Sequence, residues 1–341
     1  MNPHWKLTRL IPFPLRWRLW TLLRPERATP RDLRAAYRLI LGRVPDREGW
    51  NTFLPAIRSG SMSVRQLARC FLNGAEFRAR LDADLRSRPD PVRVETDRFA
   101  ILVSPPDTAI GKAIIETRRY EPHVARVLDE RLRAGGAFVD VGCNVGYFSL
   151  YAARVVGAEG RVTAFDPNPA NCELLTASAA LNSMDNIEVV HAAVTDRPGR
   201  VGYEDIDGNG RIVDLDRVRG GAGRVEVEAV TLDRALAEHA RIDLVKIDTE
   251  GAELLVLRGA EAVLARHAPD LVVEFSPTAL GQVSGADARA LPEFLHARGY
   301  RMAIVGEDGR AARPADGPDA ILSAMRRIRT DHADLLAVRR R

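Results

Sequence analysis

The segment AFVDVGCNVGYFSL, residues 137–150, decides the fold that the sequence predicts. An apolar run leads into a turn that holds Gly142 and Gly146, and the chain then continues with the apolar spacing of a helix. Gly142 permits a tight turn, and Gly146 lets the next helix pack closely against the strand. The free N–H groups at the start of such a helix attract an anionic ligand group. This strand–turn–helix unit is typical of α/β folds that bind nucleotide-like ligands.

The turn departs from the pattern that binds dinucleotides. That pattern, G-x-G-x-x-G, lets the backbone approach a pyrophosphate. Here Asn144 occupies the position of the second glycine and Tyr147 that of the third. S-adenosylmethionine has no phosphate, and it offers a carboxylate to the start of the helix and an ammonium group to a carboxylate such as Asp140. The turn therefore favours S-adenosylmethionine as the cofactor.

Two further segments fit the same cofactor. AFDPNP, residues 164–169, places Asp166 24 residues after Gly142, where an acidic side chain binds ribose hydroxyls. HAAV, residues 191–194, follows the next expected strand, and its Ala193 and neighbours are expected to form the adenine slot. The three segments in this order predict a complete cofactor site.

Short apolar runs alternate with amphipathic segments from residue 99 onward, which predicts an α/β fold with a parallel sheet. The expected strands cover residues 137–141, 161–166, 187–191, 242–248, 271–275 and 300–305. The expected helices cover residues 121–133, 146–156, 169–181, 231–239, 251–266 and 286–298. The polar, glycine-rich residues 199–229 are expected to form a loop or hairpin insertion near the ligand.

Residues 117–277 resemble the FkbM-type family of S-adenosylmethionine-dependent O-methyltransferases. The resemblance rests on RYEPHVARVL, FVDVGCNVGYFSLYAA, GRVTAFDPNPANCELL, IEVVHAAVTD, AVTLDRAL and IDLVKIDTEGAELLVLRGA. It implies a Rossmann-like, seven-stranded class I methyltransferase sheet whose last strand is antiparallel. It also implies cofactor contacts by Asp140, Gly142, Asn144, Gly146, Asp166 and Asn168. Cys143 stands where the family usually has alanine.

Carboxylates at the ends of two expected strands are candidates for the chemistry. LVKIDTEGAE, residues 244–253, places Lys246 and Asp248 on one face of a strand and Glu250 in the turn beyond it. Glu274 ends the next strand in LVVEFSP. A hydroxyl that attacks a methyl group benefits from a base, so these three carboxylates are catalytic or substrate-binding candidates. The alternative is that Asp248 and Glu250 only cap the following helix.

Two other assignments stay open for this edge of the sheet. His191 is a further candidate base, although a histidine at a strand end commonly bonds a backbone carbonyl instead. Asp248, Glu250 and Glu274 are also the kind of oxygen ligands that Mg²⁺ prefers. Because their spacing does not demand an ion, we assign no metal site.

The N-terminal part is predicted to be separate and helical. AYRLILGRVPDREGW and FLNGAEFRARL, within residues 29–85, resemble a small helical domain of unknown function related to phycobilisome linker repeats. The resemblance implies a protein-contact or anchoring module, with a last short helix opening at NGAE, residues 73–76. A basic and aromatic leader, residues 1–28, precedes it and either lies on anionic lipid or docks on its own domain. We expect the methyltransferase domain over residues 99–325, followed by a basic tail, 326–341.

The net charge of +4 is unevenly distributed. The first 98 residues hold 20 Lys and Arg against 10 Asp and Glu, which favours either an anionic partner or a solvated arginine-rich face. No reader motif for nucleic acid is present, and SPPD, residues 104–107, lacks the aromatic residue of amine-clamping motifs. Three widely spaced cysteines imply no disulfide framework, and no run of roughly 18 to 20 apolar residues is long enough to span a bilayer. We expect a cytoplasmic protein that can contact the inner face of the membrane.

Together these features predict an S-adenosylmethionine-dependent O-methyltransferase that acts on a hydroxyl of a sugar, glycan or polyketide-like metabolite. The alternative is a non-catalytic scaffold that reuses the fold. Retention of the glycine turn, Asp166 and KIDTEGAE argues against the scaffold, because a protein without catalysis need not keep all three.

Overall fold

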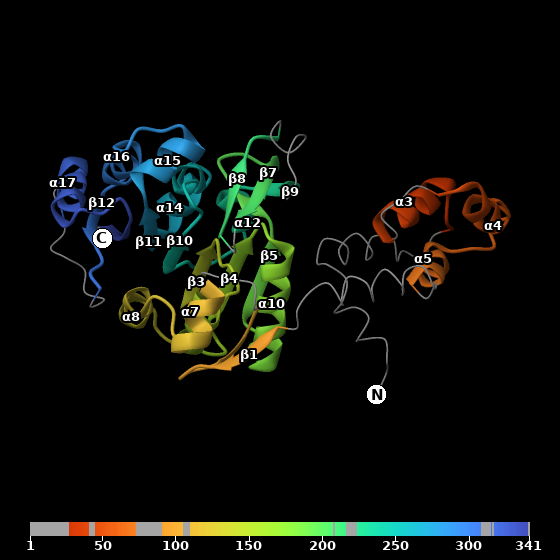
Figure 1. Ribbon diagram of the computed structural model, residues 1–341, viewed down its shortest axis with the longest axis horizontal. Helices are drawn as coiled ribbons and strands as arrows, with labels where there is room; N and C mark the ends of the chain where they lie inside the picture. Colours follow the sequence, from red (N-terminus) through yellow and green to blue (C-terminus); the bar gives the residue numbers. More distant parts are fainter. Residues whose placement is uncertain are drawn as a thin grey trace. The chain divides into compact units, whose positions relative to one another are not determined.

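The computed structural model divides the chain into two compact units, residues 1–90 and 91–341 (Figure 1). It describes residues 27–40, 45–72, 91–104, 110–206, 209–215, 224–307, 315 and 317–339. Residues 1–26 of the expected leader, 1–28, and the helix expected from residue 73 lie outside the described residues. The second unit begins at Pro91, eight residues before the boundary expected from the sequence.

The described part of the first unit consists of three helices: α3 (Pro30–Ile40), α4 (Arg47–Arg58) and α5 (Val64–Leu72). Leu33 and Leu67 are buried between them, and the ring of Tyr37 meets that of Phe71 edge-on at 4.7 Å. Asp46 caps α4 by accepting a hydrogen bond from the backbone N–H of Gly49. The apolar periodicity of the sequence therefore corresponds to a small helical core.

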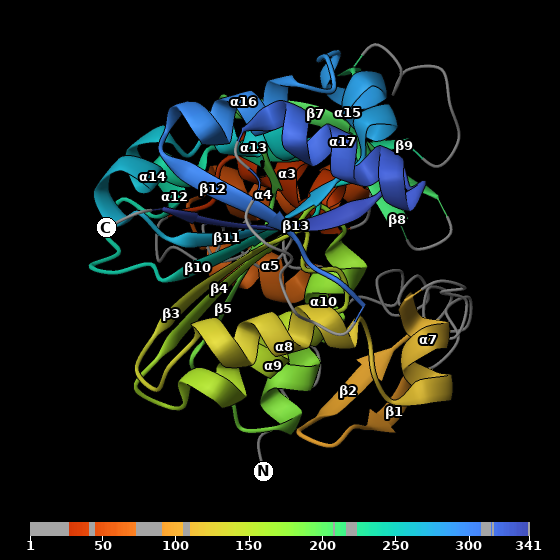
Figure 2. The ribbon, with the colours of Figure 1, turned by 90° about the vertical axis from the view of Figure 1, so that its left-hand side faces the viewer.

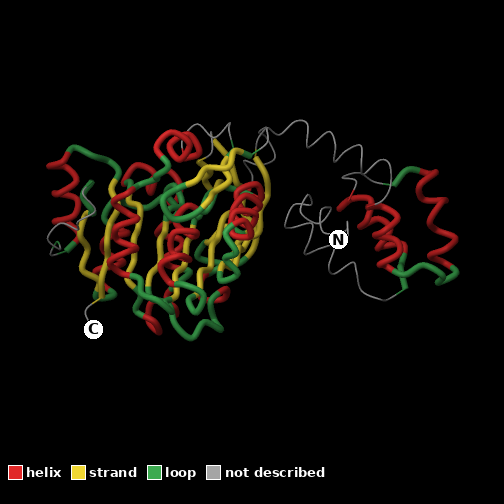
Figure 3. The backbone as a smooth tube through the Cα atoms, turned by 90° about the horizontal axis from the view of Figure 1, so that it is seen from below, coloured by secondary structure: helices red, strands yellow, loops and turns green. Residues whose placement is uncertain are grey.

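A seven-stranded sheet forms the centre of the second unit. In order across the sheet, its strands are β12 (Tyr300–Ile304), β13 (Ala333–Arg339), β11 (Asp270–Phe275), β10 (Leu244–Ile247), β3 (Ala137–Val141), β4 (Arg161–Asp166) and β5 (Ile187–His191). The strands from β11 to β5 pair in parallel, whereas β13 is antiparallel to both of its neighbours. This confirms the class I methyltransferase sheet that the resemblance implies. Figure 3 shows the strands side by side across this unit.

Helices cover both faces of the sheet because its strands are apolar on both sides. On one face, Phe138 and its neighbours pack against α8 (Pro122–Arg131), α9 (Tyr147–Val156) and α10 (Pro169–Leu181). On the other face, Val139 and its neighbours pack against α13 (Glu253–Arg258), α14 (Glu261–His267), α15 (Pro277–Ser284), α16 (Ala290–Ala297) and α17 (Pro318–Ile328). Figure 2 shows α8 and α9 on the opposite side of the sheet from α14 and α16.

The six expected strands are present, but two expected helices differ. The helix expected over 251–266 is divided into α13 and α14, because Asp233 accepts hydrogen bonds from the N–H groups of Ala262 and Val263 and so caps a new start. The helix expected over 231–239 is reduced to one turn, α12 (Leu232–Ala235). The pair β1 (Val92–Glu95) and β2 (Ala100–Val103) and the helix α7 (Ile110–Thr117) were not expected from the sequence.

Residues 326–339, most of the expected basic tail, belong to the domain. They include the end of α17 and all of β13, which lies between β11 and β12. Leu335 and Ala337 on this strand are fully buried. The arginines at the end of the chain obscure a short apolar strand, and this explains why composition alone predicted a basic tail.

The insertion expected over residues 199–229 forms most of a second, smaller sheet. Its order is β6 (Ala193–Val194), β9 (Arg224–Val230), β7 (Gly199–Ile206) and β8 (Asn209–Val213). Tyr203 and Val227 of this sheet are buried in one small apolar cluster with Ala193. Since β6 directly follows the main-sheet strand β5, the small sheet is attached at the carboxyl edge of the main sheet.

None of the helices within the described ranges combines the length and the apolar character that crossing a bilayer requires.

Candidate active site

A cavity of about 280 Å³ lies at the carboxyl ends of β3, β4, β10 and β11. The turn after β3, the end of β4 and residues 192–194 at β6 line one part of it, while carboxylates after β10 and near the end of β11 line another. Of the residues expected in the site, the lining includes Gly142, Asn144, Asp166, Ala193, Asp248, Glu250 and Glu274. The topology therefore brings together segments that are more than 130 residues apart in the sequence.

Both glycines of the turn are required by close packing. Gly142 has φ +80°, and a Cβ atom there would lie 1.7 Å from the backbone carbonyl oxygen of Asp248. Gly146 has φ +88°, and its Cβ would lie 2.2 Å from Leu175 of α10. Gly146 thus lets two helices approach each other, rather than the helix and the strand that the sequence suggested. Asn144 tolerates φ +49° because its side-chain oxygen accepts a hydrogen bond from the next N–H group, that of Val145.

Asp166 is buried at the end of β4 and lines the cavity. Its carboxylate accepts hydrogen bonds from the backbone N–H groups of Asn144 and Asn168, each at 2.8 Å, and from the side chain of Asn171 at 3.2 Å. Burial raises the pKa of Asp166 to about 6, although these hydrogen bonds act in the opposite direction. The carboxylate is therefore fixed in position beside the turn.

Asp140 lies beneath the turn and is completely buried. Its Oδ2 atom accepts a hydrogen bond from Ser149 at 2.6 Å, whereas its Oδ1 atom has no hydrogen-bond partner among the described residues. Burial raises the pKa of Asp140, and the positive charge of Lys246 lowers it in part. A buried acceptor without a donor, next to residues that line the cavity, fits a ligand that brings an ammonium group.

Three expected cofactor contacts lie outside the cavity lining: Asp140, Gly146 and Asn168. Asn168 caps α10 by accepting a hydrogen bond from Ala170, and its amide donates to Asp205 of β7 at 2.8 Å. Ala193 of β6 does line the cavity, together with Ala192 and Val194, as the expected adenine slot requires. Cys143 lines it as well, and burial raises the pKa of its thiol, so the thiol stays neutral.

The three carboxylates Asp248, Glu250 and Glu274 offer oxygen atoms that lie within 4.8 Å of one another. Burial and the charge of Asp248 raise the pKa of Glu250, and the same two causes raise that of Glu274 well above its usual value. Nζ of Lys246 lies 2.7 Å from Oδ2 of Asp248. Burial alone would lower the pKa of this lysine, but Asp248, Asp140 and Glu121 raise it, so Lys246 stays charged.

The turn before α13 is held by another carboxylate, that of Glu253. Glu253 is buried, and one of its oxygens accepts hydrogen bonds from the N–H groups of Thr249 and Gly251, each at 3.0 Å. The α13 helix has no side-chain cap at its first flanking residue, Ala252. Glu253 therefore holds the turn that carries Glu250, and the side chains of Asp248 and Glu250 line the cavity.

The structure does not place His191 in the cavity, so its assignment as a base is wrong on geometry. Its Nε2 atom lies 2.8 Å from the carbonyl oxygen of Pro167, and burial lowers its pKa. This is the backbone-bonded arrangement that is common for histidines at strand ends.

Sequence reasoning missed three residues that line the cavity: Tyr120, Glu121 and His332. Glu121 precedes α8 with φ +37°, and burial raises the pKa of its carboxyl group. Nε2 of His332 lies 3.4 Å from Glu274. The motif RYEPH was a signal for the first two, whereas His332 lies in the segment interpreted as a tail.

The part of the chain that forms the cavity is similar in sequence to known methyltransferases. The family model described as the methyltransferase FkbM domain matches residues 140–302. Methyltransferase sdnD of Sordaria araneosa is 29% identical in an alignment of 168 residues. The match covers 40% of this chain and 64%, slightly less than two thirds, of that protein. Methyltransferase 1 of Beauveria bassiana is 23% identical over 62% of this chain and 90% of its own length. The crystal structure of methyltransferase FkbM from Methylobacillus flagellatus covers 86% of this chain and 71% of its own, with 15% identity and a TM-score of 0.37.

Proposed function

Residues 140–302 belong to the FkbM methyltransferase family, whose cofactor is S-adenosylmethionine, and we propose that this protein is an O-methyltransferase. The proposed acceptor is a hydroxyl group of a sugar, glycan or polyketide-like metabolite. The observation that carries the proposal is the group of three carboxylates, Asp248, Glu250 and Glu274, in the same cavity as the glycine turn.

The cofactor is held by groups of the chain that suit its different parts. Asp166, which lines the cavity, would accept hydrogen bonds from the ribose hydroxyls. The ammonium group would be drawn toward Asp140, whose buried Oδ1 atom has no hydrogen-bond partner among the described residues. Ala192, Ala193 and Val194 form an apolar slot for adenine. The bound cofactor supplies an electrophilic methyl group.

The carboxylates orient the acceptor and take its proton. Asp248 lines the cavity, and the hydrogen bond from Lys246 to its Oδ2 atom holds its carboxylate in place. Its carboxylate receives the hydroxyl proton as the oxygen attacks. Burial and the charge of Asp248 raise the pKa of Glu274, which favours a hydrogen bond donated by its carboxyl group to a second oxygen of the acceptor. Positioned groups of this kind supply most of the rate in a displacement that needs alignment.

The experiment is transfer of a labelled methyl group from S-adenosylmethionine into sugars, glycans and polyketide-like alcohols, with and without the substitution Asp248→Asn. We expect turnover to fall by about 10²–10⁴-fold while cofactor binding, measured by calorimetry, is retained. Asp185→Asn is the control, since Asp185 is exposed in a turn. Unchanged turnover in the Asp248→Asn protein would remove the proton-accepting role, and the absence of any cofactor binding would favour a scaffold.

A further inference from the structure

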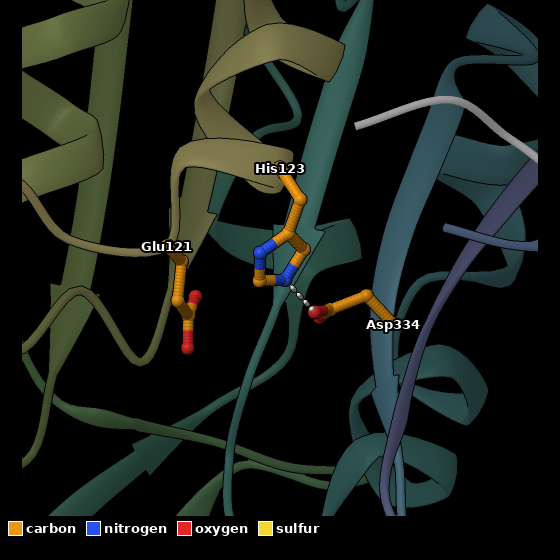
Figure 4. A group of neighbouring side chains, drawn as sticks. All are labelled: Glu121, His123 and Asp334. Carbon is orange, nitrogen blue, oxygen red and sulfur yellow. Dashed lines mark hydrogen bonds and ion pairs between the residues drawn. The ribbon is translucent and has the colours of Figure 1, made fainter. Parts of the chain in front are cut away.

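A second group of ligand-like side chains lies at the rim of the cavity. Glu121 and His123 flank the first residue of α8, and Asp334 lies on β13. Figure 4 shows the imidazole of His123 between the two carboxyl groups. Nε2 of His123 lies 2.8 Å from Oδ2 of Asp334, and one atom from each of the three residues lies within 4.8 Å of the others. All three side chains are partly buried.

Among the described residues, further carboxyl groups lie near this cluster. Asp334 lies opposite Glu274 in the β11–β13 pairing, and Glu121 shares the cavity with Asp248 and Glu250. Lys246 is already paired with Asp248. Partly buried carboxylates that are not all matched by cations favour the binding of a further positive charge.

We propose that Glu121, His123 and Asp334 bind one divalent first-row transition-metal ion. Two carboxylate oxygens and one imidazole nitrogen suit ions such as Mn²⁺, Fe²⁺, Co²⁺ or Zn²⁺, whereas Mg²⁺ and Ca²⁺ prefer oxygen alone. Bonds of about 2.1 Å place neighbouring ligand atoms about 3 Å apart, and the His123–Asp334 distance already matches this. Rotation of the longer Glu121 side chain brings the third ligand in.

An ion at this position would hold the cavity wall that contains Glu121. It links the start of α8 to β13, which are 211 residues apart in the sequence. Glu121 is a ligand and also lines the cavity, so the ion fixes one wall of the acceptor site. Three protein ligands leave coordination positions open for water or an acceptor oxygen.

The test is Mn²⁺ binding by the full chain after removal of metal with a chelator and dialysis. Electron paramagnetic resonance counts the bound ions, and electron spin-echo modulation from ¹⁴N identifies an imidazole ligand. We expect one Mn²⁺ with a nitrogen signal, which His123→Ala removes while it weakens binding at least about tenfold. The matched control is His332→Ala, because His332 is the other histidine at the cavity and contacts Glu274 instead.

Each other outcome overturns the proposal. Mn²⁺ that binds without a nitrogen signal, or equally well in the His123→Ala protein, is held by Asp248, Glu250 and Glu274. Absence of binding shows that the group is only a hydrogen-bonded pair beside a glutamate. If His123→Ala does not fold, as judged by thermal melting without metal, Glu121→Gln removes one ligand at constant size and must weaken binding. Because the measurement needs no turnover, its failure is distinct from failure of the proposed methyl transfer.

Discussion

Gly142 lies so close to Asp248 that the carbonyl oxygen of Asp248 occupies the place of a side chain at position 142. The contact joins the turn after β3 to the end of β10, two parallel neighbours in the sheet. One residue belongs to the proposed cofactor site and the other to the proposed acceptor site. The distance between the two sites is therefore set by backbone contact between neighbouring strands.

Gly142→Ala is expected to destabilise the protein and to disturb both sites. A positive φ costs an alanine about 1–2 kcal/mol, and the overlap with Asp248 adds about 1–3 kcal/mol more. Gly135→Ala is the control, because Gly135 has φ +73° but no atom within 4 Å of its Cβ position. Urea unfolding of the two variants gives the comparison. Equal losses of stability in the Gly142→Ala and Gly135→Ala proteins would contradict this prediction. They would show that the ends of β3 and β10 move apart at little cost.

Lys246→Met is expected to remove about 3–5 kcal/mol of stability near neutral pH, because it leaves buried carboxylates without their cation. Burial already raises the pKa of Asp140, and loss of Lys246 raises it further. The variant then favours protonated Asp140, so its deficit shrinks as the pH falls and grows as the pH rises. Urea unfolding at several pH values measures this dependence.

The control for this variant is Lys112→Met. Lys112 is exposed, and its ion pair with Glu116 is long, at 3.9 Å. It is expected to change stability by less than about 1 kcal/mol at any pH. A deficit in the Lys246→Met protein that does not vary with pH would mean that the lysine contributes by packing, for example against the Phe148 ring 5.0 Å away.

Apolar runs followed directly by turns predicted the central strands of the sheet correctly. The strands 137–141, 161–166 and 187–191 match β3, β4 and β5, because each is a buried run with a turn directly after it. The resemblance implied an antiparallel last strand, but the residues of β13 were not located, since arginines surround them and their pairing with β11 and β12 depends on distant parts of the chain. Burial inside a sheet is a tertiary property that a short, flanked segment does not reveal.

The sequence likewise predicted the candidate site only in part. Asp166, Asp248 and Glu274 were predicted because parallel strands end at one edge of a sheet. Tyr120, Glu121 and His332 reach the cavity from the start of α8 and the start of β13, positions that only the packing of these elements defines. His191 also follows a strand at this edge, but its ring turns to the Pro167 carbonyl, which no spacing rule foresees.

Glu253→Ala is expected to lower methyltransferase activity indirectly. Glu253 does not line the cavity, but it holds the turn that positions Glu250. The substitution leaves the N–H groups of Thr249 and Gly251 without their acceptor, at a cost of about 1–3 kcal/mol for each that stays buried. The turn that holds Glu250 at φ +53° then loosens. Steady-state kinetics should show a lower kcat, and Glu253→Gln, which keeps an oxygen acceptor, should recover most of it. Loss of activity that Gln fails to recover would mean that the charge of Glu253 is needed.

Cofactor affinity is expected to fall below about pH 6 because Asp166 must be ionised to accept hydrogen bonds from both ribose hydroxyls. Burial raises the pKa of Asp166 to about 6, so the carboxylate is ionised above this pH and protonated below it. At pH 5 about one molecule in ten carries the charge, which predicts affinity about tenfold weaker than at pH 8. Calorimetric titration with S-adenosylmethionine across this range measures the effect.

Asp166→Asn separates this effect from other titrations at the site. The amide keeps the size of the side chain but does not ionise, so binding should be weak at every pH and nearly independent of pH. Asp140 also has a pKa raised by burial, and any slope that remains in the variant reports its protonation. If the variant kept the full slope of the unmodified protein, ionisation of Asp140 would control cofactor binding and the carboxylate at the end of β4 would have no part in it.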